Sequence, residues 1–167
     1  NRETGTIQEG RPDNVAGLFV DATASGTRIQ LPENWNTALW DSTSWAGPTG
    51  LGIFAVSKSA NWKNPLPHIS AVRRTYGTFS LPLLIASAVA LENFAPDDQN
   101  IRKSNEKMRS EIAKQIPSAI VAGDLERSLP HFTSFIFPGC NGEELLRALS
   151  IRGLSVDSGS ACTAMNL

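Results

Sequence analysis

Near its end the chain reads Gly153-Leu154-Ser155-Val156-Asp157-Ser158-Gly159-Ser160-Ala161-Cys162-Thr163. A short apolar segment of strand character leads into a run of glycine, serine and alanine that surrounds Cys162. Glycine leaves φ and ψ largely unrestricted, and serine and alanine offer little side chain for packing. This pattern predicts a mobile loop that carries a thiol. A bare cysteine among small residues is also compatible with a buried free thiol, which is the usual state of that residue.

Four further motifs precede this loop. They are Asn1-Arg2-Glu3-Thr4-Gly5-Thr6-Ile7-Gln8, Leu18-Phe19-Val20-Asp21-Ala22-Thr23, Gly47-Pro48-Thr49-Gly50-Leu51-Gly52, and Gly77-Thr78 with Leu81-Pro82. In this order, and with the loop around Cys162 at the end, they resemble the cysteine desulfurases of the class V aminotransferase family. No single motif is decisive, and their common order argues against chance similarity.

The lysine that holds pyridoxal phosphate (PLP) in that family has no counterpart here. Counting back from Gly47 and Pro48 places Ser44 at the lysine position, Thr43 at the position of a histidine and Asp41 at that of a serine. A Schiff base requires an amine, and a serine hydroxyl cannot form an imine. The resemblance therefore predicts that Ser44 is non-functional in the role of the lysine.

Other cofactor positions of the family are also substituted. Arg2 and Ala24 stand where the family has an Asn and a Gln that contact the PLP ring, and Asp41 stands where a serine contacts the phosphate. At an effective dielectric constant near 20, two like charges about 4 Å apart repel by roughly 4 kcal/mol. Asp21 and Thr78 match the family, as partner of the pyridinium nitrogen and as phosphate ligand from a neighbouring subunit. We expect PLP to bind weakly or not at all.

The resemblance implies an activity in which PLP activates cysteine and the mobile thiol removes its sulfur, leaving alanine and a protein persulfide. With Cys162 in the role of persulfide acceptor, we expect a cysteine desulfurase-like protein that is partial or catalytically degenerate. One alternative is a non-catalytic interaction or regulatory module that pairs with an intact desulfurase through the surface bearing Thr78. Another is an enzyme completed by a segment on a second chain, which Ser44 disfavours.

The expected partners follow from the same resemblance. We expect the chain to form a homodimer, or a heterodimer with a desulfurase-like subunit. We also expect it to bind a sulfur-acceptor or scaffold protein of the kind used in iron–sulfur cluster assembly. Neither nucleic acid nor a membrane is expected, because the formal net charge is −1 with well-mixed signs. The apolar run at residues 81–91 is too short to span a bilayer.

The length of the chain and its cysteine content indicate its domain organisation and its cellular compartment. The 167 residues could form one domain with a real core, whereas PLP enzymes of this fold need about twice that length. We therefore expect an excised or truncated segment of a larger fold. Cys140 and Cys162 with no secretory context indicate separate thiols in a reducing, cytoplasmic compartment. His68 and His131 lack metal-ligand spacing and are interpreted as structural.

The fold class predicted from hydrophobic periodicity is α/β: the end of a PLP-transferase-type large-domain sheet, a linking helix and a small α+β lobe. We expect a partial large domain over residues 1–80, linking helices over 81–116, and over 117–167 a lobe with the cysteine loop. The strands are expected at residues 17–22, 37–40, 51–57, 119–123, 132–137 and 154–156. The helices are expected at residues 81–94, 97–116 and 142–151.

Four tryptophans lie close together in the sequence, at positions 35, 40, 45 and 62. Packing in a core or an interface is the usual role of such residues. A ligand-stacking role for Trp45, beside the substituted lysine position, is the alternative. Cys140 lies in a Pro-Gly turn before a helix and is expected to be more confined than Cys162.

Overall fold

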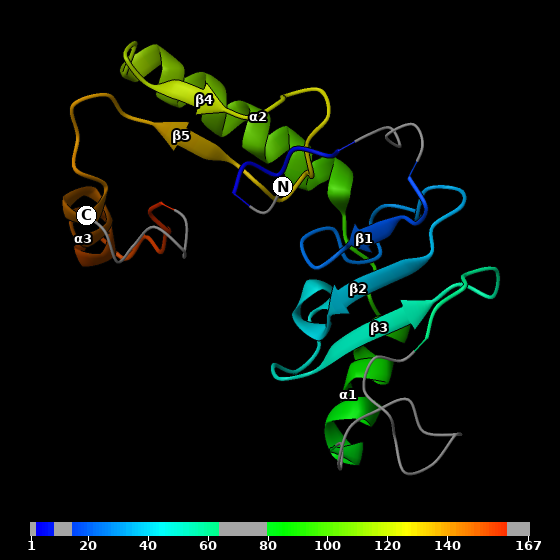
Figure 1. Cartoon of the computed structure of the whole chain (residues 1–167). Helices are drawn as coiled ribbons and strands as arrows, with labels where there is room; N and C mark the ends of the chain where they lie inside the picture. The colour runs from blue at the N-terminus through cyan, green and yellow to red at the C-terminus, as the bar shows by residue number, and fades with distance from the viewer. Residues whose placement is uncertain (1–2, 9–14, 64–79, 160–167) are drawn as a thin grey trace. The chain divides into compact units, whose positions relative to one another are not determined.

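The computed structural model describes residues 3–8, 15–63 and 80–159 (Figure 1). The chain divides into two compact units. We call residues 9–96 the sheet unit, and residues 1–8 with 97–167 the lobe unit. The domain boundaries expected at residues 80 and 116 stay predictions.

The sheet unit is built on three strands, β1 (Phe19–Asp21), β2 (Thr37–Asp41) and β3 (Gly52–Val56), in the order β1-β2-β3. β1 runs parallel to β2, with Asp21 opposite Leu39, and β3 runs antiparallel, with Gly52 opposite Asp41. All three lie where the apolar runs predicted strands. Because β1 and β2 are parallel, their carboxyl ends, at Asp21 and Asp41, lie at the same edge of the sheet.

Two helical segments complete this unit. A short 3-10 helix, η1 (Ser42–Trp45), follows β2 directly, and Ala46 ends it in the left-handed conformation at φ 60°. The predicted helix α1 (Leu81–Glu92) begins with Pro82 in its first turn, where proline costs no hydrogen bond. Contacts join α1 to η1.

The core of the sheet unit is small. Its buried apolar residues among those described are Ala22, Ala38 and Trp45, accompanied by the buried hydroxyls of Ser42 and Ser87. Ala38 is fully buried in the central strand, where a larger side chain would have no room. Trp45 is therefore the largest of the buried apolar side chains in the described part of this unit.

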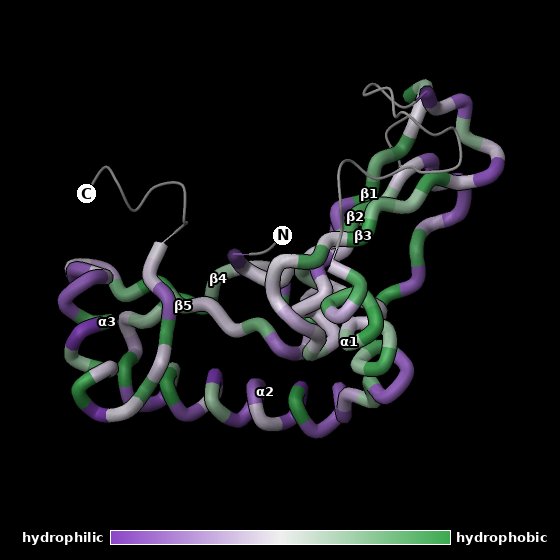
Figure 2. The backbone as a smooth tube through the Cα atoms, turned by 90° about the horizontal axis from the view of Figure 1, so that it is seen from below, coloured by the Kyte–Doolittle hydropathy of each residue, from purple (hydrophilic) through white to green (hydrophobic). Residues whose placement is uncertain are grey.

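The lobe unit contains α2 (Asp98–Gln115), the antiparallel pair β4 (Ile120–Ala122) and β5 (Ser134–Ile136), and α3 (Gly142–Ile151). Purple and green alternate along α2 in Figure 2, as expected of the amphipathic helix that the sequence predicted. Asp97 caps α2 by accepting from the amide of Asn100. Asn141 caps α3 in the same way, through the amides of Glu143 and Glu144.

The strand predicted at residues 154–156 is wrong. The amide of Leu154 donates to the carbonyl of Leu149 at 3.0 Å, and that of Gly153 donates to Ser150 at 2.9 Å. Leu154 is therefore part of the turn that closes α3 rather than of a sheet ladder. Gly153 permits this turn because its φ is +77°.

One face of α2 holds the loop between β4 and β5. Arg102 and Arg109 each donate from Nη2 to a loop carbonyl at 2.9 Å, to Ser128 and Phe132 respectively, and Asn105 donates to the carbonyl of Pro130. The three helical residues share one side of the helix because of their spacing. Their side chains replace the ladder bonds that a loop backbone lacks.

The N-terminal segment belongs to the lobe unit. Thr6 forms an antiparallel bridge with Ser128, and the amide of Ile7 donates to the carbonyl of Arg127 at 2.7 Å. Gly5 adopts φ +71°, and a Cβ there would lie 2.4 Å from the Cβ of Phe132. Only glycine allows this close approach.

The turn after β4 gives a testable pH dependence. The carboxylate of Asp124 accepts from the amides of Glu126 and Arg127 at 3.0 Å and from Arg127 Nε at 2.8 Å. Its pKa is lowered from the ordinary 3.8, first by the Arg127 amide and then by the Arg127 side chain. These bonds therefore stabilise the turn fully above pH 3.8, and the stabilisation is lost as the pH falls through the lower folded-state pKa.

We expect a carboxyl 13C titration of Asp124 to give a midpoint below 3.8. The Arg127 amide resonance should shift with the same midpoint and lose that step in Asp124→Asn. A midpoint at or above 3.8 would contradict the assignment.

No helix in the part of the chain that the structure describes is long and apolar enough to cross a membrane.

Candidate functional site

The described part of the sheet unit contains five of the eight site positions expected from the sequence: Asp21, Ala24, Asp41, Thr43 and Ser44. They lie around the carboxyl ends of β1 and β2. The other three, Arg2, Thr78 and Cys162, lie outside the described residues. The role of Cys162 as a persulfide acceptor therefore stays a prediction.

A tight turn follows β1. Oδ1 of Asp21 accepts from the amide of Thr23 at 3.0 Å and from its hydroxyl at 2.6 Å. Ala22 between them is buried and donates its amide to the carbonyl of Leu39. The exposed carboxylate of Asp21 thus holds its own turn at the sheet edge.

The same arrangement follows β2. Oδ1 of Asp41 accepts from the amide of Thr43 at 2.8 Å and from its hydroxyl at 2.7 Å. The intervening Ser42 is buried, as Ala22 is after β1. An Asp-x-Thr turn therefore ends each of the two parallel strands, and the aspartate carboxylate caps η1.

Ser44, which the resemblance predicts to stand at the lysine position, is held by backbone groups. Its Oγ donates to the carbonyl of Asp41 at 2.6 Å, and its own carbonyl accepts from Arg28 Nη1 at 3.2 Å. The turn at Gly26 lies against it, since a Cβ on Gly26 would be 2.8 Å from Ser44 Oγ. Gly26 itself has φ +58°, which favours glycine. The Ser44 hydroxyl is thus used in a hydrogen bond within the turn.

Behind this turn, Trp45 is committed to packing. Ser42 Oγ donates to Ser87 Oγ at 2.8 Å, and Trp45 Nε1 donates to the carbonyl and the hydroxyl of Ser87, both at 3.2 Å. All three residues are buried. This network joins η1 to α1 and favours the packing interpretation of Trp45.

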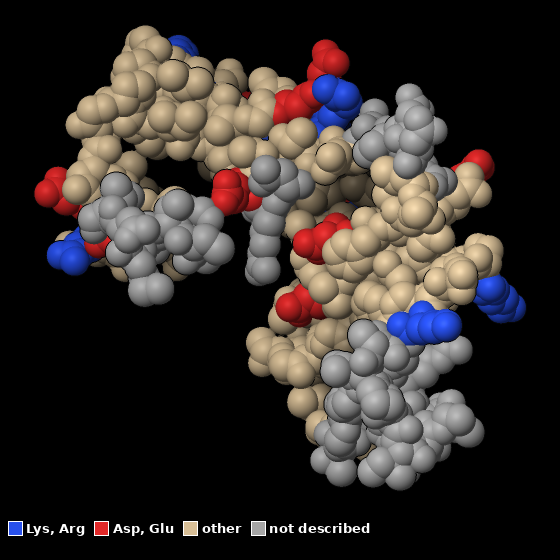
Figure 3. All heavy atoms as spheres, in the orientation of Figure 1, with Lys and Arg blue, Asp and Glu red and all other residues tan. Residues whose placement is uncertain are grey.

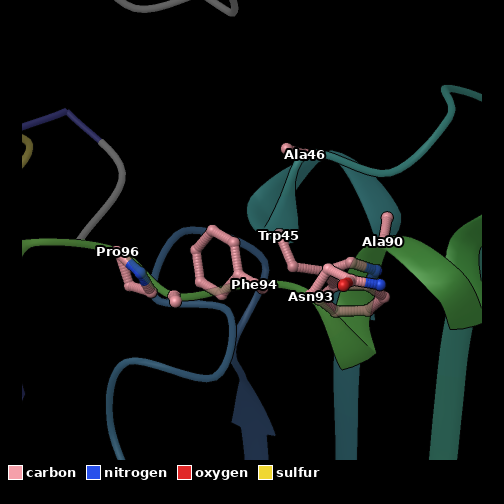
Figure 4. Close-up of a pocket in the computed structure, with 7 residues that line it drawn as sticks. Trp45, Ala46, Ala90, Asn93, Phe94 and Pro96 are labelled. Atoms are coloured by element: carbon pink, nitrogen blue, oxygen red, sulfur yellow. The ribbon is translucent and has the colours of Figure 1, made fainter.

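A hollow of about 320 Å³ lies beside this network (Figure 4). Its lining residues are Trp45, Ala46, Ala90, Asn93, Phe94, Ala95 and Pro96. Arg28 lies over the ring of Phe94, 4.8 Å from its centre. The sequence reasoning did not identify Asn93 or Phe94, and an aromatic residue directly after a helix end is too common to signal a site.

Cys140, in the turn before α3, is exposed. It was expected to be more confined than Cys162; because Cys162 lies outside the described residues, that comparison stays a prediction. His131 is half-buried and packs on Phe132 with the ring centres 4.7 Å apart. Within the described ranges, no group of three or more His, Cys, Asp or Glu could hold a metal ion.

Charge is spread thinly over the described surface. Figure 3 shows lysine, arginine, aspartate and glutamate scattered among uncharged atoms on the face it presents. The described residues on this face form no continuous basic patch.

The described residues do not fit PLP. Ser44 offers a hydroxyl where the group needs an amine, and the Thr43 amide already donates to the Asp41 carboxylate. A phosphate brought to this turn would meet that carboxylate rather than a free N–H group.

Comparisons with known proteins agree on the family. The cysteine desulfurase IscS of Ehrlichia chaffeensis is 33% identical over 184 aligned residues, which cover 100% of this chain and 44% of that protein. The cysteine desulfurase NifS of Azotobacter vinelandii is 26% identical and is covered to 45%. The cysteine desulfurase of Pongo abelii is 34% identical over 72% of this chain. No family model matches.

A solved structure of a NifS-like protein superposes with a TM-score of 0.74 at 27% sequence identity. The match covers 94% of this chain and 47% of that one. The mixed α/β fold predicted from the sequence is thereby confirmed. The chain spans less than half the length of these curated relatives and of the NifS-like structure.

Proposed function

Because the chain is homologous to the cysteine desulfurases along its whole length, we propose that it is a desulfurase-like segment that accepts sulfur rather than releasing it from cysteine. The observation that carries this proposal is the state of Ser44, whose hydroxyl donates to the carbonyl of Asp41. A hydroxyl cannot hold PLP as an imine. Cys162 is the acceptor in this proposal.

The proposed step is a transfer between sulfur atoms. The Cys162 thiolate attacks the outer sulfur of a donor persulfide, an S–S bond forms at Cys162, and the donor's S–S bond breaks. The donor leaves as a thiolate, so that no external oxidant or reductant is needed. The donor would be a desulfurase-like subunit with an intact PLP site, in a homodimer or heterodimer, and the sulfur would pass on to an acceptor or scaffold protein.

One observation favours the alternative of a non-catalytic interaction module. Leu81, Ile85 and Val89 are 53–56% exposed and lie on one face of α1 at four-residue spacing. An exposed apolar helix face is a common feature of protein interfaces. In this alternative the chain binds a desulfurase and Cys162 carries no sulfur.

Mass spectrometry of the native chain after incubation with a small-molecule persulfide separates the two functions. We expect one added sulfur atom on the peptide that contains Cys162, and no such gain in Cys162→Ser. The adduct should vanish on treatment with a thiol reductant, which cleaves the persulfide.

Cys140→Ser is the matched control and should keep the adduct at Cys162. In the wild-type chain, Cys140 is exposed and serves as a reference for unassisted reaction, so the adduct at Cys162 should form faster than that at Cys140. Absence of the adduct at Cys162, or equal rates at the two thiols, would overturn sulfur carriage and leave the interaction module.

A further inference from the structure

The missing lysine at position 44 is one departure from the family's cofactor site. The turn at Asp41, which precedes position 44, is a second and independent departure. We propose that Asp41 makes the edge of the sheet at β2 exclude anions, so that a phosphate-bearing ligand would be rejected even with an amine restored at position 44. The inference deepens the proposed function, because it rests on the same turn. It concerns ligand charge and not sulfur transfer.

The geometry supports exclusion in two ways. The amide of Thr43 would be the first N–H donor available to an anion at the start of η1, and it donates to Asp41 Oδ1 at 2.8 Å. The hydroxyl of Thr43 donates to the same oxygen at 2.7 Å. The aspartate carboxylate thus supplies its own anion to the end of the helix, where an added anion would otherwise bind.

The neighbouring strand end has the same sign. Asp21 closes the parallel strand β1 with an identical turn, and its carboxylate is exposed at the same edge. The nearby guanidinium of Arg28 donates to the carbonyl of Ser44 and lies over the ring of Phe94. Two strand ends at this edge therefore each carry an aspartate carboxylate that accepts from the threonine two residues on.

The test compares PLP with pyridoxal, which has the same aldehyde and no phosphate. Ser44→Lys supplies the amine; its condensation with the aldehyde releases water, and borohydride reduces the C=N bond so that peptide mass spectrometry can count adducts. The exposed Lys58 gives the unassisted reaction in the same sample. The ratio of PLP adduct to pyridoxal adduct is measured at position 44 and divided by the same ratio at Lys58. This division cancels the different reactivities of the two aldehydes.

Adding Asp41→Asn to Ser44→Lys removes the charge and keeps an oxygen that can cap η1. We expect this double variant to raise the ratio by about tenfold or more, because a like charge within a few ångströms is removed. The matched control is Ser44→Lys with Asp97→Asn, which neutralises the aspartate that caps α2. An unchanged ratio in the first double variant, or an equal rise in the control, would overturn the proposal.

A second measurement avoids position 44 in case Ser44→Lys does not fold. Inorganic phosphate is titrated into the wild-type chain and into Asp41→Ala, which removes both the charge and the oxygen that occupies the Thr43 amide, and the Thr43 amide resonance is followed. We expect a concentration-dependent shift in Asp41→Ala and at least about tenfold less response in the wild type. Equal responses would overturn the proposal, and neither result depends on whether Cys162 carries sulfur.

Discussion

Trp45→Ala is expected to lower the free energy of opening of the sheet unit by about 3–5 kcal/mol, the usual cost of deleting a large buried aromatic side chain. Trp45 is 2% exposed and is the largest fully buried side chain among the described residues. The substitution also removes Trp45 Nε1, which donates to the carbonyl oxygen and to the hydroxyl oxygen of Ser87. Each of these two acceptors loses one bond, although Ser87 Oγ still accepts from Ser42 Oγ.

Hydrogen exchange with peptide resolution is the appropriate measurement, because two compact units need not unfold as one transition. Peptides covering β2 and α1 should lose protection together. Trp62→Ala is the matched control, since Trp62 is only half-buried, with its ring centre 5.7 Å from that of Phe54. Equal losses from the two substitutions would show that the network of Ser42, Trp45 and Ser87 does not hold η1 to α1.

Gly47→Ala is expected to destabilise the same turn by about 2–3 kcal/mol, as overpacking of a closed site does. A Cβ at Gly47 would lie 2.2 Å from Ser42 Oγ and 2.9 Å from the Ser42 carbonyl oxygen. The hydroxyl cannot rotate away without giving up its bond to Ser87, and the carbonyl is part of the backbone. The turn itself would have to move.

Gly50→Ala separates this clash from the general cost of replacing a glycine. Gly50 has φ +84° and nothing within 4 Å of its would-be Cβ, so alanine meets only backbone strain. That strain costs about 1–2 kcal/mol. The amide exchange of β2 is measured as a function of urea concentration, and its midpoint is compared between variants. Gly47→Ala should lower this midpoint more than Gly50→Ala does. The reverse order would refute the close packing of Gly47 on Ser42.

Local pattern predicted most of the secondary structure. The apolar runs around Val20, Ala38 and Phe54 became β1, β2 and β3, and the helices predicted from residues 81, 97 and 142 begin within one residue of those positions. Such elements depend on side-chain periodicity and on punctuation by Pro, Gly and Asp, which are properties of neighbouring residues. The strand predicted at residues 154–156 does not form, because an apolar run becomes a strand only beside a hydrogen-bonding partner. The closing turn of α3 had already taken the amide of Leu154.

Contacts between distant residues were not predictable in this way. Ser87 is one serine in an apolar helix, and its sequence neighbours do not indicate that it accepts from Ser42 and Trp45, 45 and 42 positions away. Gly5 gives no sign in the sequence that it packs on Phe132. Each contact requires chain segments that only the folded state brings together.

The candidate site divides along the same line. The sequence by itself determined that residue 44 cannot form an imine, because a serine hydroxyl is no amine in any conformation. It also located Asp21 and Asp41 at strand ends. Only the tertiary structure decided how these groups are used: the Asp41 carboxylate is bonded to the amide and hydroxyl of Thr43, and Ser44 is held by a carbonyl under the Gly26 turn. Covalent chemistry belongs to the residue, whereas the partner of a hydrogen bond is set by which groups the fold leaves within about 3 Å of each other.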